Sequence, residues 1–269
     1  MRVVVHLSDL HFGRLDPVSV APLGAAISRL SPDLLAVSGD LTQRARRSEF
    51  TAAREFLDAL PFQRLVVPGN HDVPLYNVFT RFATPLARYT HAITDELSPV
   101  YRDEEMIVVG VNTARSWTWG EGRINASQVD AIVSQLSGAP RDLIRIVVTH
   151  HPFDLPEGVR EERLLGRAVM AMEKLSAAGA DLFLAGHLHI SHIGHTAERY
   201  KIGGHSALVV QAGTVSTRSR GEQPSFNVLR IERPRISVER MVWDPERGAF
   251  VATGESHYRH GEAGWIKAD

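Results

Sequence analysis

The sequence predicts an α/β protein in which two mixed β-sheets pack face to face, with helices on their outer sides. Through about residue 185, short apolar runs alternate with amphipathic stretches of helical period, as strands and helices do in α/β folds. After residue 185 the helical period is lost, and short apolar runs follow one another through brief turns. A hydrophobic fraction of 43% in 269 residues is enough for a full core.

The first part of the chain contains three expected strands separated by two expected helices. The strands are the apolar runs at 3–7, 34–37 and 65–67. Asp16 followed by Pro17 is typical of a helix start, because Asp caps the first turn and Pro is favoured at its first position. The apolar residues that recur at helical spacing are Val20, Leu23, Ile27 and Leu30 in the first helix, and Phe50, Ala53, Leu57 and Leu60 in the second.

The middle of the chain is less regular. Residues 75–92 are expected to form one or two helices broken at Pro85, and Asn125 with Gln128 resembles the capping box that opens a helix. That helix would end at Gly138. The remaining elements expected here are strands at 106–111, 143–148 and 182–185 and a helix at 164–175.

The last third is predicted to be β-rich. Strands are expected near 192–202, 205–212, 225–232 and 235–243, with no helix between them. We expect residues 1–250 to form a single domain, and the polar residues 251–269 to be a peripheral C-terminal tail.

Composition excludes several kinds of function. A net charge of −1 gives no global field that would attract a nucleic acid polymer or an anionic membrane. The absence of cysteine removes disulfides, zinc-thiolate sites and thiol nucleophiles. The N-terminal apolar stretch is too short for a signal peptide, and no apolar run approaches the ~18 residues of a membrane span. We therefore expect a soluble cytoplasmic protein.

Five short polar segments carry the chemistry, and most of them follow an expected strand directly. They are Asp9-Leu10-His11, Gly39-Asp40, Gly69-Asn70-His71-Asp72, His150-His151 and Gly186-His187-Leu188-His189. Ligands in open α/β sheets collect at the carboxyl ends of strands, so these segments are expected to converge.

The convergent side chains suit a pair of divalent metal ions. A phosphate ester resists attack by water, and two cations about 3.5–4 Å apart overcome this by binding the phosphoryl oxygens and lowering the pKa of a bridging water. Such a pair needs imidazoles, hard oxygen ligands and a carboxylate that touches both ions. Taken singly, each segment has an ordinary alternative, such as a surface turn, an Asx cap or a core histidine. Their joint occurrence, in order, favours the metal site.

In this order, the five segments resemble those of the calcineurin-like metallophosphoesterase superfamily over roughly residues 3–215. Within it, the chain is most similar to bacterial class III cyclic-nucleotide phosphodiesterases and glycerophosphodiesterases. The resemblance implies a four-layer fold, a β-sandwich of two mixed sheets flanked by helices. Residues 1–250 would then be the single metallophosphoesterase domain.

The resemblance also implies a role for each polar side chain. Asp9, His11 and His189 would hold the first metal ion, and Asp40 would bridge the two ions. The second ion would be held by Asn70, His150 and His187, with His151 left open as an alternative to His150. His71 would contact the phosphoryl group or protonate the leaving alkoxide, and Asp72 would orient His71.

The function implied is hydrolysis of a phosphoester by a hydroxide that bridges two divalent ions. Mixed imidazole and carboxylate ligands suit Mn, Fe or Zn as these ions. The leading hypothesis is a phosphodiesterase acting on a small soluble substrate, either a cyclic nucleotide or a glycerophosphodiester. The alternatives are a phosphomonoesterase or nucleotide pyrophosphatase with the same site, and a non-catalytic metal-binding scaffold. Neither a nucleic acid polymer nor a membrane is an expected partner, and a dimer is compatible with the exposed strands.

Some other side chains are candidates for choosing the substrate. Arg14, Arg44, Arg46 and Arg47 follow metal-ligand segments, and Trp117 and Trp119 occupy an expected loop in which a base could stack. A solvated helix start for the arginines and ordinary packing for the tryptophans are the alternatives. Arg218 and Arg220 lie in a polar loop, and the sequence assigns them no specific role.

Overall fold

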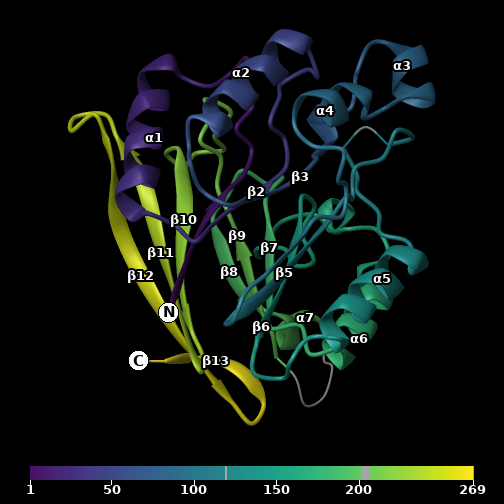
Figure 1. Cartoon of the computed structure of the whole chain (residues 1–269), viewed down its shortest axis with the longest axis vertical. Helices are drawn as coiled ribbons and strands as arrows, with labels where there is room; N and C mark the ends of the chain where they lie inside the picture. Colours follow the sequence, from purple (N-terminus) through teal and green to yellow (C-terminus); the bar gives the residue numbers. More distant parts are fainter. Residues whose placement is uncertain (119, 201–205, 269) are drawn as a thin grey trace.

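The strands are arranged in two sheets that face each other, with helices outside them (Figure 1). The computed structural model describes residues 1–118, 120–200 and 206–268. Its helices are α1 (Pro17–Leu30), α2 (Arg47–Asp58), α3 (Val78–Ala83), α4 (Ala87–Ala92), α5 (Ala126–Ser137), α6 (Ala168–Ala177) and α7 (Thr196–Tyr200). None of these helices combines the length and the apolar character needed to cross a bilayer, within the ranges described.

The seven-stranded sheet has the order β13-β12-β11-β10-β1-β2-β3. Its strands are β1 (Arg2–Leu7), β2 (Leu34–Ser38), β3 (Arg64–Val67), β10 (Ser225–Glu232), β11 (Arg235–Asp244), β12 (Ala249–Gly261) and β13 (Gly264–Ala268). β1, β2 and β3 are parallel, and β10 joins β1 in the antiparallel sense. The sheet is therefore mixed, as the sequence predicts.

The six-stranded sheet has the order β4-β5-β6-β7-β9-β8. Its strands are β4 (Val100–Arg102), β5 (Met106–Val111), β6 (Ile144–Thr149), β7 (Leu182–Ala185), β8 (His192–His195) and β9 (Leu208–Gln211). β5, β6, β7 and β9 are parallel, whereas the two edge strands are antiparallel to their neighbours.

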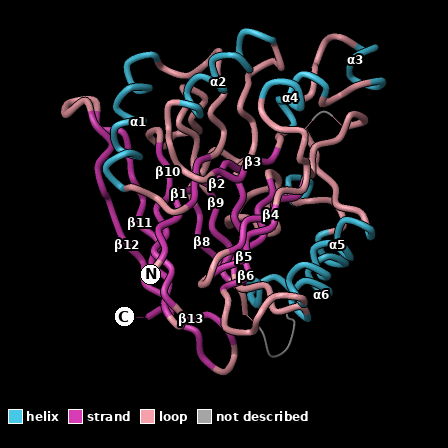
Figure 2. The backbone as a smooth tube through the Cα atoms, viewed as in Figure 1, coloured by secondary structure: helices cyan, strands magenta, loops and turns pink. Residues whose placement is uncertain are grey.

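Successive side chains on a strand point to opposite faces of a sheet, and this produces three apolar cores. Val4 of β1 lies in the core between the sheets, whereas Val5 packs with residues of α1 and α2. In the same way Ile146 of β6 faces the core between the sheets, and Val147 packs with residues of α5 and α6. Figure 2 shows the helices along the outside of the strands. The four-layer β-sandwich expected from the sequence is confirmed.

Local signals identified several elements correctly. Asp16 caps α1 by accepting a hydrogen bond from the Val18 amide, and Asn125 and Gln128 form a reciprocal capping box at the start of α5. Residues 75–92 contain two short helices, α3 and α4, on either side of Pro85.

One helix contradicts the prediction of strands alone in the last third. Thr196–Tyr200 is the helical turn α7, although the sequence predicted a strand through 202. Arg199 Nε donates to Asp154 Oδ1 at 2.6 Å, and the Tyr200 hydroxyl donates to the Phe153 carbonyl. These partners are distant in sequence, so the turn is stabilised by contacts that local periodicity does not encode. The parts of the expected strands at 201–205 lie outside the described residues.

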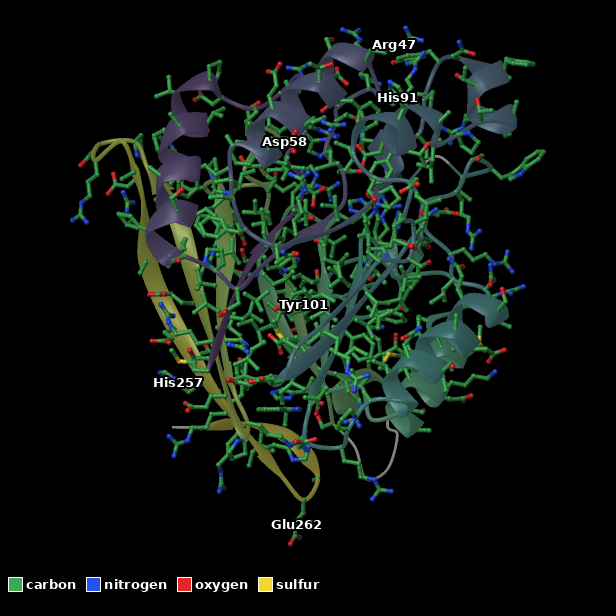
Figure 3. The ribbon with its side chains drawn as sticks, viewed as in Figure 1. Arg47, Asp58, His91, Tyr101, His257 and Glu262 are labelled. Carbon is green, nitrogen blue, oxygen red and sulfur yellow. The ribbon has the colours of Figure 1, made fainter. Side chains whose placement is uncertain are left out.

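Residues 251–268, which were expected to belong to a peripheral tail, are instead mainly strands, and residue 269 lies outside the described residues. These residues complete β12 and form β13, and Glu262 lies at the tip of the hairpin that joins them (Figure 3). Trp265 is fully buried, and its Nε1 donates to Asp181 Oδ1 at 2.9 Å. A polar composition concealed this because a two-stranded edge needs few apolar side chains when its backbone is paired.

Candidate metal centre

The five polar segments follow β1, β2, β3, β6 and β7, and they meet where the two sheets come together. The Asp9 amide donates to the Gly39 carbonyl at 3.1 Å, and the His11 amide donates to the Asp40 carbonyl at 2.9 Å. In the other sheet, the Gly186 amide donates to the His150 carbonyl at 3.1 Å. Backbone hydrogen bonds therefore join neighbouring segments before any side chain is considered.

The backbone is strained at these segments. Asp9, His11, Asp40, His187 and His189 all have positive φ, with values of 54°, 45°, 53°, 71° and 58°. A side chain with a Cβ disfavours this region, and such residues cluster at functional sites where the surrounding structure holds them. All five residues lie in the loops that follow β1, β2 and β7.

Glycines next to these residues allow the segments to approach closely. A Cβ on Gly69 would lie 2.1 Å from Asp40 Oδ1, and one on Gly186 would lie 2.5 Å from Asp9 Oδ2. Gly39 has a φ of +90°, and a Cβ there would lie 2.7 Å from His150 Nδ1. Any larger residue would displace a carboxylate or an imidazole of the cluster.

One half of the site is a fully buried cluster of Asp9, His11, Asp40 and His189. Asp9 Oδ1 lies 3.0 Å from His189 Nε2 and 3.5 Å from His11 Nε2, and it has no hydrogen-bond donor. Asp9 Oδ2 accepts from the Ser8 hydroxyl at 2.6 Å and the His187 amide at 2.9 Å. The carboxylate is thus fixed through one oxygen and presents the other to the imidazoles.

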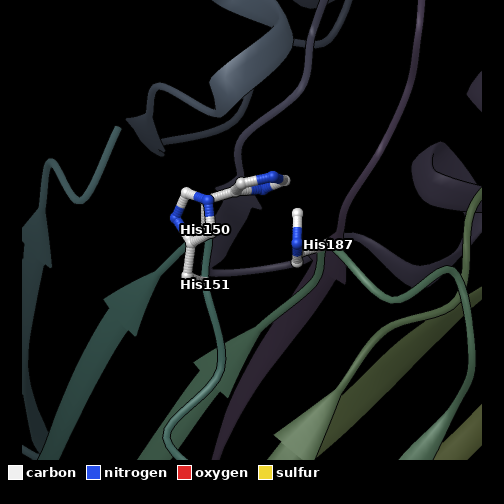
Figure 4. A group of neighbouring side chains, drawn as sticks. All are labelled: His150, His151 and His187. Carbon is white, nitrogen blue, oxygen red and sulfur yellow. The ribbon is translucent and has the colours of Figure 1, made fainter. Parts of the chain in front are cut away.

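The other half of the site brings Asn70, His150 and His187 together. Asn70 Oδ1 lies 3.1 Å from His150 Nε2 and 3.1 Å from His187 Nδ1. His151 also lies close, with its ring centroid 4.6 Å from that of His187 (Figure 4). Its Nδ1 is 2.8 Å from the Thr113 hydroxyl, whereas the polar contacts to Asn70 and Asp40 are made by His150.

Asp40 links the two halves. Its Oδ2 lies 3.6 Å from His11 Nε2 and 3.4 Å from His150 Nε2, and its Oδ1 accepts a hydrogen bond from the His71 amide at 2.8 Å. The carboxylate thus stands between an imidazole of each group, the position that the sequence predicted for a bridging ligand.

Backbone carbonyls determine which ring nitrogen faces the site. The Nδ1 atoms of His11, His150 and His189 lie 3.3, 2.8 and 2.7 Å from the carbonyls of Thr42, Ser38 and Arg218. A carbonyl can only accept, so each Nδ1 carries the hydrogen and each neutral ring presents the Nε2 lone pair inward. This is the orientation of a metal-binding histidine that is held by a second hydrogen bond.

The inward atoms fit a pair of cations. His11 Nε2 and His189 Nε2 are 3.1 Å apart, and His150 Nε2 faces the Asn70 carbonyl oxygen at the same distance. When a metal ion is bound and the rings are neutral, these atoms present lone pairs to one another, and a positive charge between them would hold them together. Imidazole, carboxylate and amide oxygen together suit a divalent transition metal. The donor set therefore fits the metal pair that the sequence predicted.

The electrostatics of the site also favour positive charge. Burial alone would lower the pKa of His150, but the neighbouring Asp40 carboxylate raises it to about 9, so a metal ion that binds Nε2 at neutral pH must displace a proton from this ring. Burial would raise the pKa of Asp40, but His150, His71 and His11 hold it well below its usual range. At neutral pH the carboxylate is ionised and stabilises a cation beside it. By contrast, burial and the charge of His150 lower the pKa of His187 to about 3.

His71 borders the cluster, and its partners differ from those predicted. Its Nδ1 lies 2.9 Å from the Gln43 carbonyl, and its Nε2 lies 3.0 Å from Arg218 Nη1. Asp72, predicted to orient His71, instead accepts hydrogen bonds from the amides of Gly69, Leu41 and Thr42 and from the Thr42 hydroxyl. Within the described residues, Asp72 makes no hydrogen bond to the His71 ring, so its orienting role stays a prediction.

Burial and the charge of Asp40 raise the pKa of Asp72 to about 7, despite these hydrogen bonds. Asp72 ties the loop after β3 to the loop after β2. The Thr42 hydroxyl contacts both Asp72 Oδ1 and the His71 carbonyl, and Gln43 belongs to the loop after β2, so Asp72 is linked to His71 through these loops.

Several supporting residues were not identified from the sequence. Ser8 fixes Asp9, Gln43 holds His71, Thr113 contacts His151 and Arg218 contacts both His71 and His189. All four lie in loops, and two of them, Gln43 and Arg218, contact a ligand or His71 through a backbone carbonyl, which every residue has. No residue-type signal could have found them.

The candidate substrate-contacting residues lie in different surroundings. Arg44 lies over the Tyr76 ring at 5.2 Å, and Arg47 begins α2 at the surface (Figure 3). Trp117 is 84% exposed and packs on Phe82. Trp119 lies outside the described residues. Within the described ranges, the side chains of Arg44, Arg47 and Trp117 make no hydrogen bond or ion pair with the metal cluster.

The sequence and the fold are both similar to known phosphoesterases. The family model of the calcineurin-like phosphoesterases matches residues 2–191. The glycerophosphodiester phosphodiesterase GpdQ of Enterobacter lignolyticus (strain SCF1) is 28% identical over 171 residues, which cover 58% of this chain. They also cover 58% of that protein, so the match spans little more than half the length of the relative.

Two solved structures share the fold. A dimetal phosphatase from Danio rerio has a TM-score of 0.64 with 13% sequence identity, covering 93% of this chain and 98% of its own. A purple acid phosphatase, PPD1, from yellow lupin seeds has a TM-score of 0.70 with 13% identity, covering 94% of this chain and 53% of its own. With a family match over most of its length and a two-part cluster of Asp and His side chains, the chain belongs to the calcineurin-like phosphoesterase family.

Proposed function

We propose that this protein is a phosphodiesterase that hydrolyses a small phosphodiester, either a cyclic nucleotide or a glycerophosphodiester, with two divalent metal ions. The observation that carries the proposal is the position of Asp40 between His11 and His150, because a carboxylate shared by two imidazole groups is what a binuclear site requires. The similarity to a glycerophosphodiester phosphodiesterase supports a diester rather than a monoester.

We assign Asp9, His11 and His189 to one ion and Asn70, His150 and His187 to the other, with Asp40 shared. His150 is preferred to His151, because His150 Nε2 faces both Asn70 and Asp40, whereas His151 Nδ1 is engaged with Thr113. When bound, such a pair supplies charge neutralisation for the phosphoryl oxygens and a nucleophile at neutral pH. Mn, Fe or Zn would suit these ligands.

His71 is proposed to handle the proton of the leaving ester oxygen. Its Nδ1 is held by the Gln43 carbonyl, so Nε2 is the atom that can exchange a proton with substrate. A ring fixed through one nitrogen keeps the other in a constant direction, which general acid–base catalysis needs. We place the protein in the cytoplasm and treat a dimer as a further hypothesis.

The proposal is tested by hydrolysis assays on protein loaded with Mn²⁺, Fe²⁺ or Zn²⁺. Bis-p-nitrophenyl phosphate, p-nitrophenyl phosphate, cyclic AMP and glycerophosphoethanolamine would be compared at equal concentration. We expect faster hydrolysis of the diesters, and the Asp40→Ala variant supplies the background rate. A preference for the monoester would reject the diesterase assignment, and no turnover of any ester by the metal-loaded protein would favour a scaffold.

A further inference from the structure

Arg218 places its guanidinium directly against the candidate proton-transfer residue. Its Nη1 lies 3.0 Å from His71 Nε2, and the contact is partly buried. Because the Gln43 carbonyl takes the hydrogen on His71 Nδ1, the neutral ring offers a lone pair at Nε2, and Arg218 is the donor. Arg218 therefore points at the one nitrogen of His71 that faces outward.

The loop around Arg218 is fixed to the metal cluster by its backbone and by short polar side chains. The Arg218 carbonyl accepts from His189 Nδ1 at 2.7 Å, and the Thr214 hydroxyl donates to the Asp9 carbonyl at 2.7 Å. The Thr217 amide and hydroxyl both donate to the Arg14 carbonyl. These contacts hold the loop through backbone groups and short side chains, and none of them uses the Arg218 guanidinium.

The guanidinium has donors to spare. Among the described residues, no carboxylate lies within ion-pairing distance of Arg218. A neutral imidazole nitrogen uses one of its five N–H groups, whereas a phosphoryl group can accept two in a fork. A phosphoryl anion is thus a better hydrogen-bond partner for the Arg218 guanidinium than the neutral His71 ring.

Two other arginines, Arg163 and Arg220, lie near Arg218. Arg220 follows two residues later, and burial together with the charges of Arg163 and Arg218 lowers its pKa. Arginines from the loop after β9 and from the turn Glu161–Arg163 are therefore close enough to repel one another. These cations together add a positive potential that favours a bound anion.

We propose that Arg218 is a substrate-binding residue, whose guanidinium donates hydrogen bonds to the non-bridging oxygens of the phosphoryl group beside His71. The inserted phosphoryl group replaces the direct contact between Arg218 and His71 and accepts hydrogen bonds from Arg218. The inference rests on the proposed function for the identity of the substrate. The role of Arg218 itself requires only that a phosphoryl group binds beside His71. The family match ends at residue 191, so it does not include Arg218.

The test measures binding of inorganic phosphate by calorimetry, separately from catalysis. Wild type would be compared with Arg218→Ala, Arg218→Lys and the matched control Arg29→Ala, which removes an exposed arginine from the last turn of α1. Metal content and the thermal midpoint of each variant would be measured on the same samples. We expect Arg218→Ala to weaken phosphate binding by about 10- to 100-fold, the scale of a lost hydrogen bond to a charged group. Arg218→Lys should recover part of the affinity, and Arg29→Ala should match wild type.

Equal phosphate affinity in Arg218→Ala and wild type would overturn the proposal, as would a wild-type protein that does not bind phosphate. If Arg218→Ala loses its metal or its fold, Arg218→Lys decides the outcome. If Arg218→Lys has normal metal content and folding and binds phosphate as tightly as wild type, Arg218 has a structural role and the proposal is overturned. If no phosphoester is hydrolysed by wild type but phosphate binding still depends on Arg218, the proposed function fails and this inference stands. Where turnover is measurable, a rise in KM larger than the fall in kcat would further support substrate binding.

Discussion

Asp40 Oδ2 lies 3.4 Å from His150 Nε2, and this contact joins the two sheets of the sandwich at the candidate metal centre. Asp40 follows β2 of the seven-stranded sheet, and His150 follows β6 of the six-stranded sheet. The site therefore exists only when the sheets are packed, because each sheet alone carries part of the cluster.

Replacement of Asp40 by Ala should remove the metal ions and abolish turnover. Mutation of a residue that only hydrogen-bonds to a metal ligand typically lowers metal affinity by 10–100-fold. Loss of the shared carboxylate is therefore expected to lower metal affinity by more than about 100-fold. Metal content after gel filtration measures the first effect and diester hydrolysis the second. Asp130→Ala, which removes an exposed acid on α5, is the control. Full metal content in Asp40→Ala would contradict the bridging assignment.

Replacement of His71 by Ala should leave the metal content unchanged and slow hydrolysis by roughly 10²–10⁴-fold, the usual scale of general-acid assistance. The loss should be larger for an alkyl ester than for a p-nitrophenyl ester, because p-nitrophenolate leaves readily without a proton. Rates for both esters, on samples of known metal content, separate this role from ligation. A variant that retains the full rate on the alkyl ester would remove His71 from the mechanism.

Replacement of Gly69 by Ala should lower both metal affinity and stability. The new Cβ would lie 2.1 Å from Asp40 Oδ1 and 2.3 Å from the Asp40 amide, so the carboxylate or the loop must move. Overpacking of this kind costs about 1–3 kcal/mol in the free energy of unfolding. Thermal unfolding and metal titration would be compared with Gly254→Ala, where a Cβ meets nothing within 4 Å. Identical behaviour of the two variants would show that the close approach is unimportant.

Replacement of Trp265 by Ala should destabilise the whole protein by about 3–5 kcal/mol, the usual cost of removing a large buried aromatic side chain. Trp265 is fully buried and donates to Asp181, whereas the neighbouring Ile266 is 45% exposed and serves as the control in Ile266→Ala. Urea denaturation of both variants measures the difference. If the two variants unfold at the same urea concentration, the C-terminal hairpin is peripheral after all.

Stability should depend on pH through Asp103. Burial would raise its pKa, but hydrogen bonds from the amides of Glu105 and Met106, from Tyr101 and from Arg2 lower it in the folded state. A carboxyl with a lowered folded pKa stabilises the fold above the unfolded value of about 4, and this contribution is lost as pH falls through the folded value.

The difference in free energy of unfolding between wild type and Asp103→Asn should therefore be constant from pH 7 to about 5 and shrink below about 4. Chemical denaturation at each pH provides the measurement. Asp95→Asn, at an exposed position, is the control. A difference that grows as the pH is lowered would reverse the expected sign.

The sequence by itself determined the fold class, the capped helices α1 and α5, and the candidate ligand segments. These follow from local rules: periodicity reports which face is buried, caps satisfy free amides, and polar residues after an apolar strand mark its carboxyl end. The seven candidate ligands could be selected because their residue types and order are distinctive, even though they lie far apart in the chain.

Only the tertiary structure decided the partners of those residues. In the folded protein Asp72 bonds to loop amides, backbone carbonyls bind the Nδ1 atoms of the ligand histidines, and Arg218 contacts His71. Residues 196–200 form a helix, and Trp265 is buried. Each of these depends on contacts between residues distant in sequence, made by groups such as carbonyls and single arginines that carry no local pattern. Local chemistry specifies which side chains are available, whereas the packing of the two sheets decides which of them meet.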